Sequence, residues 1–524
     1  MNDTIEDDRR TLEDGRRTLN DLTVSADAEV KAKEVELGKE EQPTSFTRNE
    51  IWFIVGVVAI AGLFSPLPAN IYFPAIPTLT GVFHESTSKL NLTITVYLVF
   101  QGISPMVWGP ISDFYGRRPT YLICLVILVL SCLGLALVPA NAFWLLLVLR
   151  CFQAAGCAST IALGAGVIGD ISTRKDRGGY FGAFNLGPQM APVIGPVLGG
   201  ALAQGLGWRS IFWFLCIFSG CCLIFVLLFL PETHHSIEAG GSRLSKLVYS
   251  PVIRVVGRSE QSTLPKATQH PKTSDGTPAP APKRKHIRNP LPLFLNPSVS
   301  LALVFTAIIY AVWYCVTATI SSAFAVKYPF LSETDIGLCY LPIGSGMLIS
   351  SAVHGRVLDA EYRRFQRRWI ADGEGDREKG VSGERDFPIE RARMRLLPLH
   401  VVVFVASVIG WGWCVQAGVH LSGPLILQLP IGYTFNAVLN TTMTLMIDIE
   451  HAQSSSVTAC TNLARCGLAA VMTAVIDYIT DALGYGWTYV LLGGIAALMI
   501  PLIYVEMIMS PRWRARRAAR QAHA

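Results

Sequence analysis

The sequence predicts an all-α membrane protein, with twelve transmembrane helices arranged in two halves of six. The first observation behind this prediction is the composition of the 524 residues, of which 51% are hydrophobic and 16% are charged. Soluble globular proteins carry about 25% charged residues, and the mean hydropathy of this chain is +0.40. A soluble core could not bury this much apolar surface, whereas a lipid bilayer covers it.

The second observation is the spacing of the apolar runs, because about 20 apolar residues cross the hydrocarbon layer as a helix. Most of the runs contain Gly or Pro, which transmembrane helices tolerate where neighbouring helices satisfy the backbone. The predicted spans are 52–73, 91–111, 120–139, 142–168, 180–203, 209–230, 299–321, 334–355, 397–417, 421–447, 457–480 and 486–507.

The third observation is a polar linker, which separates the spans into six and six. Its part 264–290 is rich in Pro, Lys, Thr and Ser, which is typical of a flexible connection. The expected domains are a disordered cytoplasmic N-terminal tail (1–50), an N-terminal half (51–231), the cytoplasmic linker (232–298), a C-terminal half (299–508) and a basic C-terminal tail (509–524).

Lys and Arg residues predict the orientation, because they are enriched in cytoplasmic segments. With the N-terminus in the cytoplasm, the inside segments hold 39 of the 44 Lys and Arg residues, whereas the outside loops hold only Lys89, Arg209 and Lys327. We therefore expect both termini in the cytoplasm and a first span that acts as its own insertion signal. The formal charge of +6 follows from this topology, so it is poor evidence for nucleic-acid binding.

The segment 109–119 is a charged elbow between two apolar runs, and it reads Gly-Pro-Ile-Ser-Asp-Phe-Tyr-Gly-Arg-Arg-Pro. We expect Gly109 to permit close helix packing and Asp113 to accept bonds from arginines or helix amides. Anchoring of the loop alone would explain the two arginines but not the carboxylate. The elbow therefore predicts a latch of charges that is made in one conformation and broken in another. The residues assigned to it are Gly109, Asp113, Gly116, Arg117 and Arg118.

A partial copy of the elbow follows the eighth predicted span. Gly355 precedes Asp359 by four residues, and Asp359 precedes Arg363 by four, which repeats the spacing of the first elbow. Tyr362 stands where the first elbow has its second glycine. The matching positions in the two halves indicate duplication. We therefore expect Asp359 and Arg363 to belong to the latch of charges as well. The charged segment 386–395, before the ninth span, is expected to lie as a helix along the inner membrane face.

The elbow resembles the signature between the second and third spans of transporters of the major facilitator superfamily. Transporters of this superfamily consist of two related halves of six helices. The resemblance therefore implies the major facilitator fold and transport by alternating access.

Arg150 lies within the fourth predicted span, eight residues from its start. A rise of 1.5 Å per residue places it roughly 12 Å deep, within a layer of about 30 Å. A charged side chain at that depth faces a polar cavity, unless it is a structural arginine that only bonds backbone carbonyls; both readings stay open. The run from Arg150 through Gln153 to Gly156 resembles, with substitutions, the Arg-x-x-Gln-Gly-x-Gly motif of the superfamily. In proton-coupled relatives this arginine is implicated in coupling and substrate handling.

The fifth predicted span holds three prolines and four glycines within residues 187–200. This composition is typical of a kinked helix at a close-packed interface. Its end, Gly-Pro-x-x-Gly-Gly, resembles the motif of exporters rather than importers in the superfamily. The packing residues assigned to this motif are Gly187, Pro188, Gly195, Pro196, Gly199 and Gly200.

Polar and aromatic residues on the spans are candidates for a central cavity, since such surfaces suit amphipathic organic molecules. Arg465 lies about nine residues into the eleventh span, roughly 13 Å deep, so the argument made for Arg150 applies to it as well. Each of the others, taken alone, serves packing as readily as binding. The remaining candidates for the substrate and proton pathway are Gln153, Asn70, Gln101, Asn185, Gln189, Trp313, Tyr314, Asn436 and Asn440, with Tyr310, Tyr433 and Asn462 beside them.

No carboxylate is obvious in the middle of a predicted span. Exporters of cationic drugs usually need an acidic residue in the cavity, so this pattern favours neutral or anionic substrates and leaves the proton-carrying residue unidentified. Asn91-Leu92-Thr93 is a glycosylation sequon that abuts the second span, a position that argues against its use. The acidic residues near span ends are Asp113, Asp170, Asp448, Asp477 and Glu506.

Several other function classes are disfavoured. Gly164-x-Gly166-x-x-Gly169 has the spacing of a dinucleotide site but lies within a span, without a preceding strand. The chain lacks the phosphate-binding loop of ATP-driven pumps and has no His, Cys or Asp set with metal-ligand spacing; its cysteines lie in predicted spans, where packing explains them. Scattered histidines argue against a membrane-embedded transferase, and the short tail argues against a sensor on the same fold. We expect no enzyme activity and no cofactor.

The end of the first span, Ser-Pro-Leu-Pro-Ala-Asn at 65–70, completes the set of motifs. Together they resemble the twelve-span drug:proton antiporter branch, especially its fungal quinidine-resistance-type members. The resemblance implies a secondary transporter of the cell membrane that exports a drug-like molecule or secondary metabolite and is driven by the proton gradient. The string Asp-Phe-Pro-Ile-Glu at 386–390 is similar to fungal relatives that export organic acids such as citrate, which is the alternative. We expect a monomer whose partners are the bilayer and a small-molecule substrate.

Overall fold

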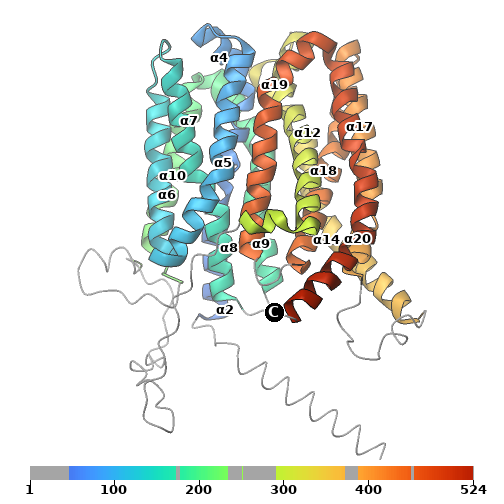
Figure 1. Ribbon diagram of the computed structural model, residues 1–524. Coiled ribbons are helices and arrows are strands. Elements are labelled where there is room, and N and C mark those ends of the chain that lie inside the picture. The colour runs from blue at the N-terminus through green and yellow to red at the C-terminus, as the bar shows by residue number, and fades with distance from the viewer. Residues whose placement is uncertain are drawn as a thin grey trace, which may run out of the picture.

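The computed structural model describes residues 46–172, 177–233, 251, 291–371, 388–449 and 454–522. In these ranges the chain forms a bundle of long helices that run roughly parallel to one another (Figure 1). Most of the expected N-terminal tail and linker, and much of the loop before the ninth span, lie outside the described residues. The all-helical fold class predicted from the sequence is confirmed.

The first predicted span is broken into several helical pieces. Thr47 caps its start, because its hydroxyl accepts from the Glu50 amide while the Glu50 carboxylate accepts from the Thr47 amide. The run Ser65-Pro66-x-Pro68 then interrupts the helix, since proline lacks the amide that would continue the hydrogen-bond ladder. The pieces are α2 (Arg48–Leu63), α3 (Leu67–Asn70), η1 (Phe73–Ala75) and α4 (Ile76–Phe83).

The remaining helices follow the predicted order, and several of them extend beyond the predicted apolar runs. In the N-terminal half they are α5 (Thr87–Tyr115), α6 (Arg117–Ala136), α7 (Phe143–Cys157), α8 (Ser159–Ile171), α9 (Arg177–Leu206) and α10 (Arg209–Phe229). In the C-terminal half they are η2 (Leu291–Leu295), α12 (Pro297–Lys327), α13 (Glu333–Leu338), α14 (Leu341–Ala371), α16 (Ile389–Met394), α17 (Leu397–Ala417), α18 (Ser422–Ile449), α19 (Ser454–Ala497) and α20 (Met499–Ala522).

Ten helices among the described residues are long and apolar enough to cross a membrane. The last of them, Val457–Arg514, contains the non-helical residue Gly484, whose φ of 74° breaks the helix, and Figure 1 shows the chain turning back there. It therefore covers both of the last two predicted spans. The 28-residue helix α18 is not among the ten, because Asn, Gln and Thr side chains lower its hydropathy. The count of twelve spans stays a prediction.

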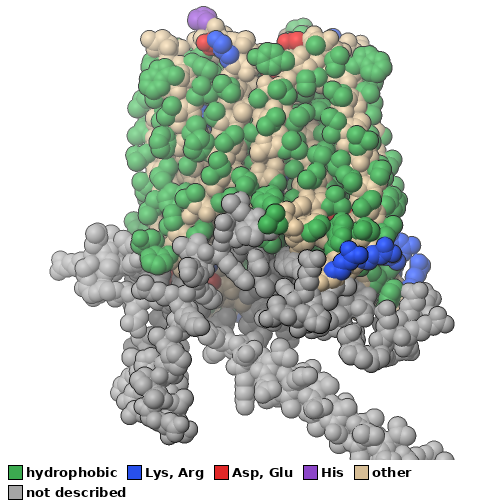
Figure 2. Space-filling view, in the orientation of Figure 1, with side chains coloured by type: hydrophobic (Ala, Val, Ile, Leu, Met, Phe, Trp, Pro, Cys, Tyr) green, Lys and Arg blue, Asp and Glu red, His purple; other side chains and the backbone are tan. Residues whose placement is uncertain are grey.

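The two ends of the bundle are distinguished by the chain termini. We call the end at which α2 begins and α20 ends the tail side, and the opposite end the far side (Figure 1). Between these ends the visible surface is densely covered by apolar side chains (Figure 2). Leu130, Ile217 and Val471 are about three-fifths exposed, a state that a bilayer explains and water does not.

Helix α9 packs against the first span at backbone distance. A Cβ atom at Gly187 would overlap the carbonyl oxygen of Ala59, and one at Gly199 would overlap that of Ile71. Three prolines lie inside α9, and each removes an amide donor from its ladder. Small residues let transmembrane helices approach this closely, so the glycines of this span lie at a helix crossing.

Contacts on the far side and in the middle of the bundle join the two halves. On the far side Thr78 donates to Glu333, and Asn91 donates to Asp477 over 2.6 Å. A Cβ at Gly200 would overlap the Glu333 carbonyl oxygen, so α9 and α13 also touch there. The structure therefore has its far side closed.

Candidate functional site

The elbow between α5 and α6 holds a cluster of three charged residues on the tail side. Arg117 Nη1 lies 2.6 Å from Asp113 Oδ1, and its Nε lies 3.0 Å from Asp170 Oδ2 at the end of α8. Gly116 connects the two helices with a φ of 105°, which favours glycine. We call Asp113, Arg117 and Asp170 the N-half charge cluster. It links the ends of three helices.

The glutamate after α10 supports this cluster from the other side. The Glu232 carboxylate accepts from the backbone amides of Arg117 and Arg118, over 2.9 and 3.1 Å, as expected for an anion at a helix N-terminus. The buried Arg118 side chain donates to the Leu227 carbonyl oxygen over 2.5 Å. The expectation for Gly109 is wrong, since a Cβ there would meet no atom within 4 Å.

The C-terminal half repeats the cluster, with an arginine that the spacing in the sequence did not indicate. Arg393 Nη1 lies 3.4 Å from Asp359 Oδ1, and its Nε lies 3.0 Å from Asp448 Oδ2. The predicted partner Arg363 is instead exposed on α14. Helix α14 continues past the predicted span end and carries Arg363 away, while α16 brings Arg393 in. We call Asp359, Arg393 and Asp448 the C-half charge cluster.

Arg150 is fully buried on α7 and has no carboxylate partner among the described ion pairs. Its guanidinium lies over the rings of Tyr72 and Tyr97, 4.4 and 4.5 Å from their centroids. Nη1 donates to the Pro68 carbonyl oxygen over 3.1 Å and to Gln153 Oε1 over 2.7 Å. The helix break after α3 leaves that carbonyl free to accept. Nε and Nη2 have no hydrogen-bond partner within the described part of the chain.

Arg465 is half-buried on α19, and no carboxylate pairs with it among the described residues either. Its Nε and Nη2 donate to Asn462 Oδ1 over 3.2 and 2.8 Å, and its guanidinium lies 5.1 Å from the centroid of Tyr310. Asn462 in turn donates to the Gln101 carbonyl oxygen of α5 over 2.7 Å. The second arginine therefore lies next to the contact between the halves.

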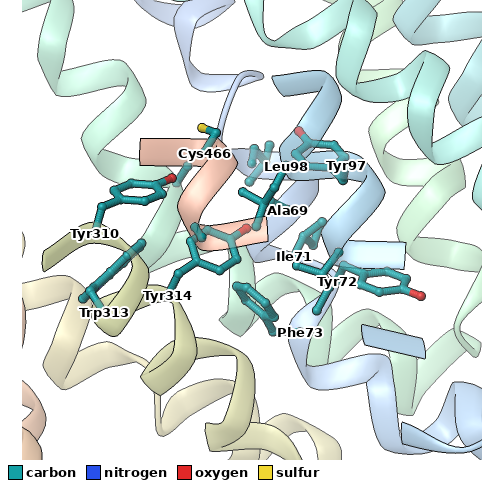
Figure 3. Close-up of a cluster of buried hydrophobic side chains, with 14 of the residues drawn as sticks. Ala69, Ile71, Tyr72, Phe73, Tyr97, Leu98, Tyr310, Trp313, Tyr314 and Cys466 are labelled. Carbon is teal, nitrogen blue, oxygen red and sulfur yellow. The ribbon is translucent and has the colours of Figure 1, made fainter. Parts of the chain in front are cut away.

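Aromatic rings from both halves form one cluster of buried side chains (Figure 3), and Tyr72, Tyr97 and Tyr310 of this cluster contact the arginines. Trp313 of α12 stacks on Phe435 of α18 at 4.3 Å between ring centroids. Phe73 of the first span contacts Tyr314 edge-on at 5.8 Å. The Trp313 Nε1 and the Tyr314 hydroxyl are buried, and neither has a hydrogen-bond partner in the ranges that the structure describes. Both groups are thus available to a ligand once the helices part.

The predicted amide residues fall into different surroundings. Gln189 Nε2 donates across the halves to Asn436 Oδ1 over 3.2 Å, and Asn436 also donates to Ser351 over 2.8 Å. The Asn70 side chain donates to the Pro66 carbonyl oxygen, four residues earlier in the same span. The structure thus joins Gln189 and Asn436 directly.

The other predicted amides lie apart from this pair. Gln101 is buried beside the first span, where its Nε2 donates to the Ser65 carbonyl oxygen. Asn185 is exposed on α9, and Asn440 is half-buried on α18.

The arrangement of helices, charge clusters and buried arginines agrees with the comparison to known proteins. Residues 58–474 match the sequence model described as Major Facilitator Superfamily. The chain belongs to this superfamily.

Curated relatives cover most of this major facilitator protein. Citrate exporter 1 of Aspergillus niger is 36% identical over 91% of this chain and 89% of the relative. The MFS-type transporter phiD of a fungal species is 35% identical over 94% of this chain and 74% of the relative. The MFS antiporter QDR2 of Candida albicans is 33% identical, over 92% and 94%. The resemblance to fungal drug:proton antiporters is therefore confirmed.

A solved structure also matches the fold. The human organic anion transporter MFSD10 aligns with a TM-score of 0.54 and 17% sequence identity, over 88% of this chain and all of that chain. Together the matches make this protein a multi-span membrane transporter of small molecules, and its family is one of transport proteins rather than enzymes.

Four residues in or beside the charge clusters were missed as site residues from the sequence. In the sequence Asp170 and Asp448 stand out only as acids near span ends, and nothing marks Glu232 or Arg393 as partners of the elbows. Asp170 and Asp448 lie at the ends of the fourth and tenth predicted spans, which are equivalent in the two halves. Comparison of equivalent span ends is therefore the signal that could have paired them.

Proposed function

We propose that this protein exports a small organic compound, a drug-like molecule or a secondary metabolite, in exchange for protons. Substrate and proton would use one central site that faces each side of the membrane in turn. The proposal rests on the side chains found at the centre of the bundle. There, two arginines without a carboxylate partner among the described residues lie over aromatic rings of the first span, α5 and α12. Such a site suits neutral or anionic amphipathic molecules.

The direction of transport is supported by α9 and by the names of relatives. The segment Gly-Pro-x-x-Gly-Gly at 195–200 resembles the exporter motif, and its glycines lie at close contacts with the first span and with α13. The relatives include proteins named antiporter and exporter. Export from the tail side to the far side follows if the tail side is cytoplasmic, as the distribution of Lys and Arg predicts. We place the protein in the cell membrane, acting as a monomer without nucleic-acid partners.

A second candidate substrate is an organic acid such as citrate. The observation that favours it is the same pair of arginines, because two uncompensated guanidinium groups can share a substrate with several carboxylates. A relative named citrate exporter is 36% identical. An acid of this kind needs charge partners rather than aromatic faces, so the two candidates differ in which residues they require.

The test is loss of preloaded substrate from cells or vesicles with an imposed pH gradient. An amphipathic aromatic dye and radiolabelled citrate are compared in parallel, with empty-vector membranes as the control. We expect export of at least one of them to accelerate when the far side is acidic and to stop when an ionophore collapses the gradient. Export that is unchanged by collapse of the gradient excludes proton exchange.

Two substitutions connect transport to the site. Arg150→Ala and Arg465→Gln are each expected to lower export at least tenfold, because each removes a cation from the centre. Arg209→Gln is the matched control, since Arg209 lies at the far-side start of α10, over the ring of Trp208. If Arg150→Ala exports as well as the wild type, the role assigned to Arg150 is wrong.

A further inference from the structure

Asn91 and Asp477 form a polar contact between the halves on the far side. Asn91 lies in the second turn of α5, and Asp477 lies seven residues before the turn at Gly484. Asn91 Nδ2 lies 2.6 Å from Asp477 Oδ2. Helices α5 and α19 lie side by side in Figure 1 and make one of the most extensive contacts between the halves. The pair is thus part of the closed far side.

The Asp477 carboxylate has no cationic partner among the described ion pairs. Lys89, the lysine of the same end of α5, is exposed and pairs with Glu85 instead. Ser88 of α5 lies close enough to interact with the carboxylate, but its hydroxyl carries no charge. The negative charge of Asp477 is therefore not compensated within this contact.

The titratable groups around Asp477 are acidic or neutral. They lie on α19, the helix that carries Asp477, and on α12, which packs against α19. The groups that interact electrostatically with the Asp477 carboxylate are Asp481, Tyr485, Tyr489 and Cys315. None of them supplies a positive charge, so a proton is the simplest way to neutralise this carboxylate when it is buried.

An unsatisfied atom on the other side of the contact points to the missing ligand. Asn91 is only 2% exposed, and its Oδ1 has no hydrogen-bond donor among the residues that the structure describes. A buried amide oxygen without a donor is costly. A carboxylate can only accept hydrogen bonds, whereas a protonated carboxyl also carries one O–H donor. One added proton would therefore give Asn91 Oδ1 the donor that it lacks.

We propose that Asp477 binds the coupling proton, and that its protonated carboxyl pairs with the Asn91 carboxamide through two hydrogen bonds when the far side is closed. The inference rests on the proton exchange proposed above and names the residue that takes up the proton. The proton comes from water on the far side while that side is open. A hydronium ion gives up the proton, so one of its O–H bonds breaks as the O–H bond of Asp477 forms, one water molecule is left behind, and the carboxylate loses its negative charge.

The consequence is that protonation favours closure of the far side. Closure packs Asp477 against α5. Burying a charged carboxylate without a cation is unfavourable, whereas a neutral carboxyl with two hydrogen bonds to Asn91 can be buried at little cost. Because one proton binds, the ratio of closed to open forms changes by at most about tenfold per pH unit. An acidic exterior would thus return the protein to the state in which the tail side accepts substrate.

The test measures opening of the far side without any transport. Phe73 is buried between Tyr314 and Tyr340 of the other half, so a cysteine at this position (Phe73→Cys) reports separation of the halves. A membrane-impermeant maleimide is added from the far side, at a pH of about 5 and of about 8. An aspartate with the ordinary pKa of about 3.9 is ionised at both values, so a pH dependence in this range reports a carboxyl that keeps its proton in the closed form. Labelling of the parent chain, which keeps its native cysteines, is subtracted. The intrinsic pH dependence of the thiol reaction is corrected with a cysteine at the exposed Asn141.

We expect the corrected labelling of the Phe73→Cys chain to be at least fivefold slower at the lower pH. Adding Asp477→Asn, which mimics the protonated carboxyl, should make labelling slow at both pH values. Asp481→Asn, at an exposed position one turn on, is the matched control and should keep the pH dependence. Asn91→Asp places two carboxylates together, and we expect it to move the pH dependence to higher pH.

The outcomes separate this inference from the proposed function. If Asp477→Asn keeps the pH dependence of the parent, or if Asp481→Asn abolishes it, the assignment to Asp477 is overturned, even where export is driven by protons. If labelling responds as expected but export ignores the pH gradient, proton exchange is wrong while proton binding at Asp477 stands.

Discussion

Arg393 donates from Nε to Asp448 over 3.0 Å, and this bond ties α16 to the end of α18. Arg117 and Asp170 make the same bond, at the same distance, in the other half. In each cluster a second carboxylate is about two-thirds exposed, with values of 63% for Asp113 and 66% for its counterpart in the C-terminal half. Because equivalent atoms pair at equivalent helix ends, the two clusters are copies of one structural motif.

We predict that Arg393→Ala lowers export about tenfold. The arginine and Asp448 are mostly buried, at 15% and 23% exposure, and a hydrogen bond between charged groups contributes about 1.5 to 3 kcal/mol. Loss of about 1.5 kcal/mol in one conformation changes the ratio of conformations about tenfold. Export rates, normalised to the amount of protein in the membrane, measure the effect.

Arg363→Ala is the matched control for this prediction. Arg363 is exposed on α14, so its removal should leave export within about twofold of the wild type. Equal losses for the two substitutions would show that the charge of the tail side matters and the cluster does not.

The sequence predicted the first charge cluster better than the second, for a physical reason. Asp113 and Arg117 are neighbours on consecutive helices, so local spacing reports their contact. Asp359 and Arg393 are 34 residues apart, and their contact depends on how α16 returns to α14. The nearer Arg363 had the expected spacing, but a continuous helix keeps it outside. Spacing cannot reveal a contact that tertiary packing makes.

The depth of charged residues was a more reliable signal than the identity of polar ones. Helical rise predicts both Arg150 and Arg465 deep within the spans. The structure buries Arg150 among residues of its own half and places Arg465 next to the contact between the halves. Only its residue type makes Asn70 a candidate, and in the structure its amide donates to the Pro66 carbonyl oxygen of the same span. The fold class and the family followed from composition and motifs, because the bilayer constrains helix length strongly.

We predict that Gly187→Ala and Gly199→Ala each destabilise the protein. A methyl group at either position would overlap a backbone carbonyl oxygen of the first span, and overpacking of this kind typically costs about 1 to 3 kcal/mol. Lower melting temperature in detergent and lower yield in the membrane are the expected results.

Gly182→Ala on the same helix is the matched control, because a Cβ there meets no atom within 4 Å. It should leave the melting temperature unchanged or slightly raised, since Ala favours helix more than Gly does. Equal destabilisation by all three substitutions would indicate a requirement for helix flexibility instead of close packing.

We predict that Asn91 carries no glycan. Its side chain is 2% exposed and bonded to Asp477, so a transferase cannot reach it in the folded chain. Treatment with an endoglycosidase should leave the electrophoretic mobility unchanged. Phe143→Thr creates a sequon at the exposed Asn141 on the far side and should give a glycan-dependent shift. A shift of the native chain that Asn91→Gln removes would contradict the buried position of Asn91.

Trp313 separates the two candidate substrates. Its ring stacks on Phe435 at 4.3 Å, and an aromatic contact contributes about 0.5 to 1.5 kcal/mol beyond its buried area. We predict that Trp313→Ala raises the KM for an aromatic amphipathic substrate about tenfold, whereas the KM for citrate changes by less than about threefold. Trp313→Phe keeps an aromatic face and should restore most of the affinity. A larger rise of the KM for citrate than of the KM for the aromatic substrate would contradict this prediction. It would indicate that Trp313 shapes the whole site, and it would favour an organic acid as the substrate that the two arginines bind.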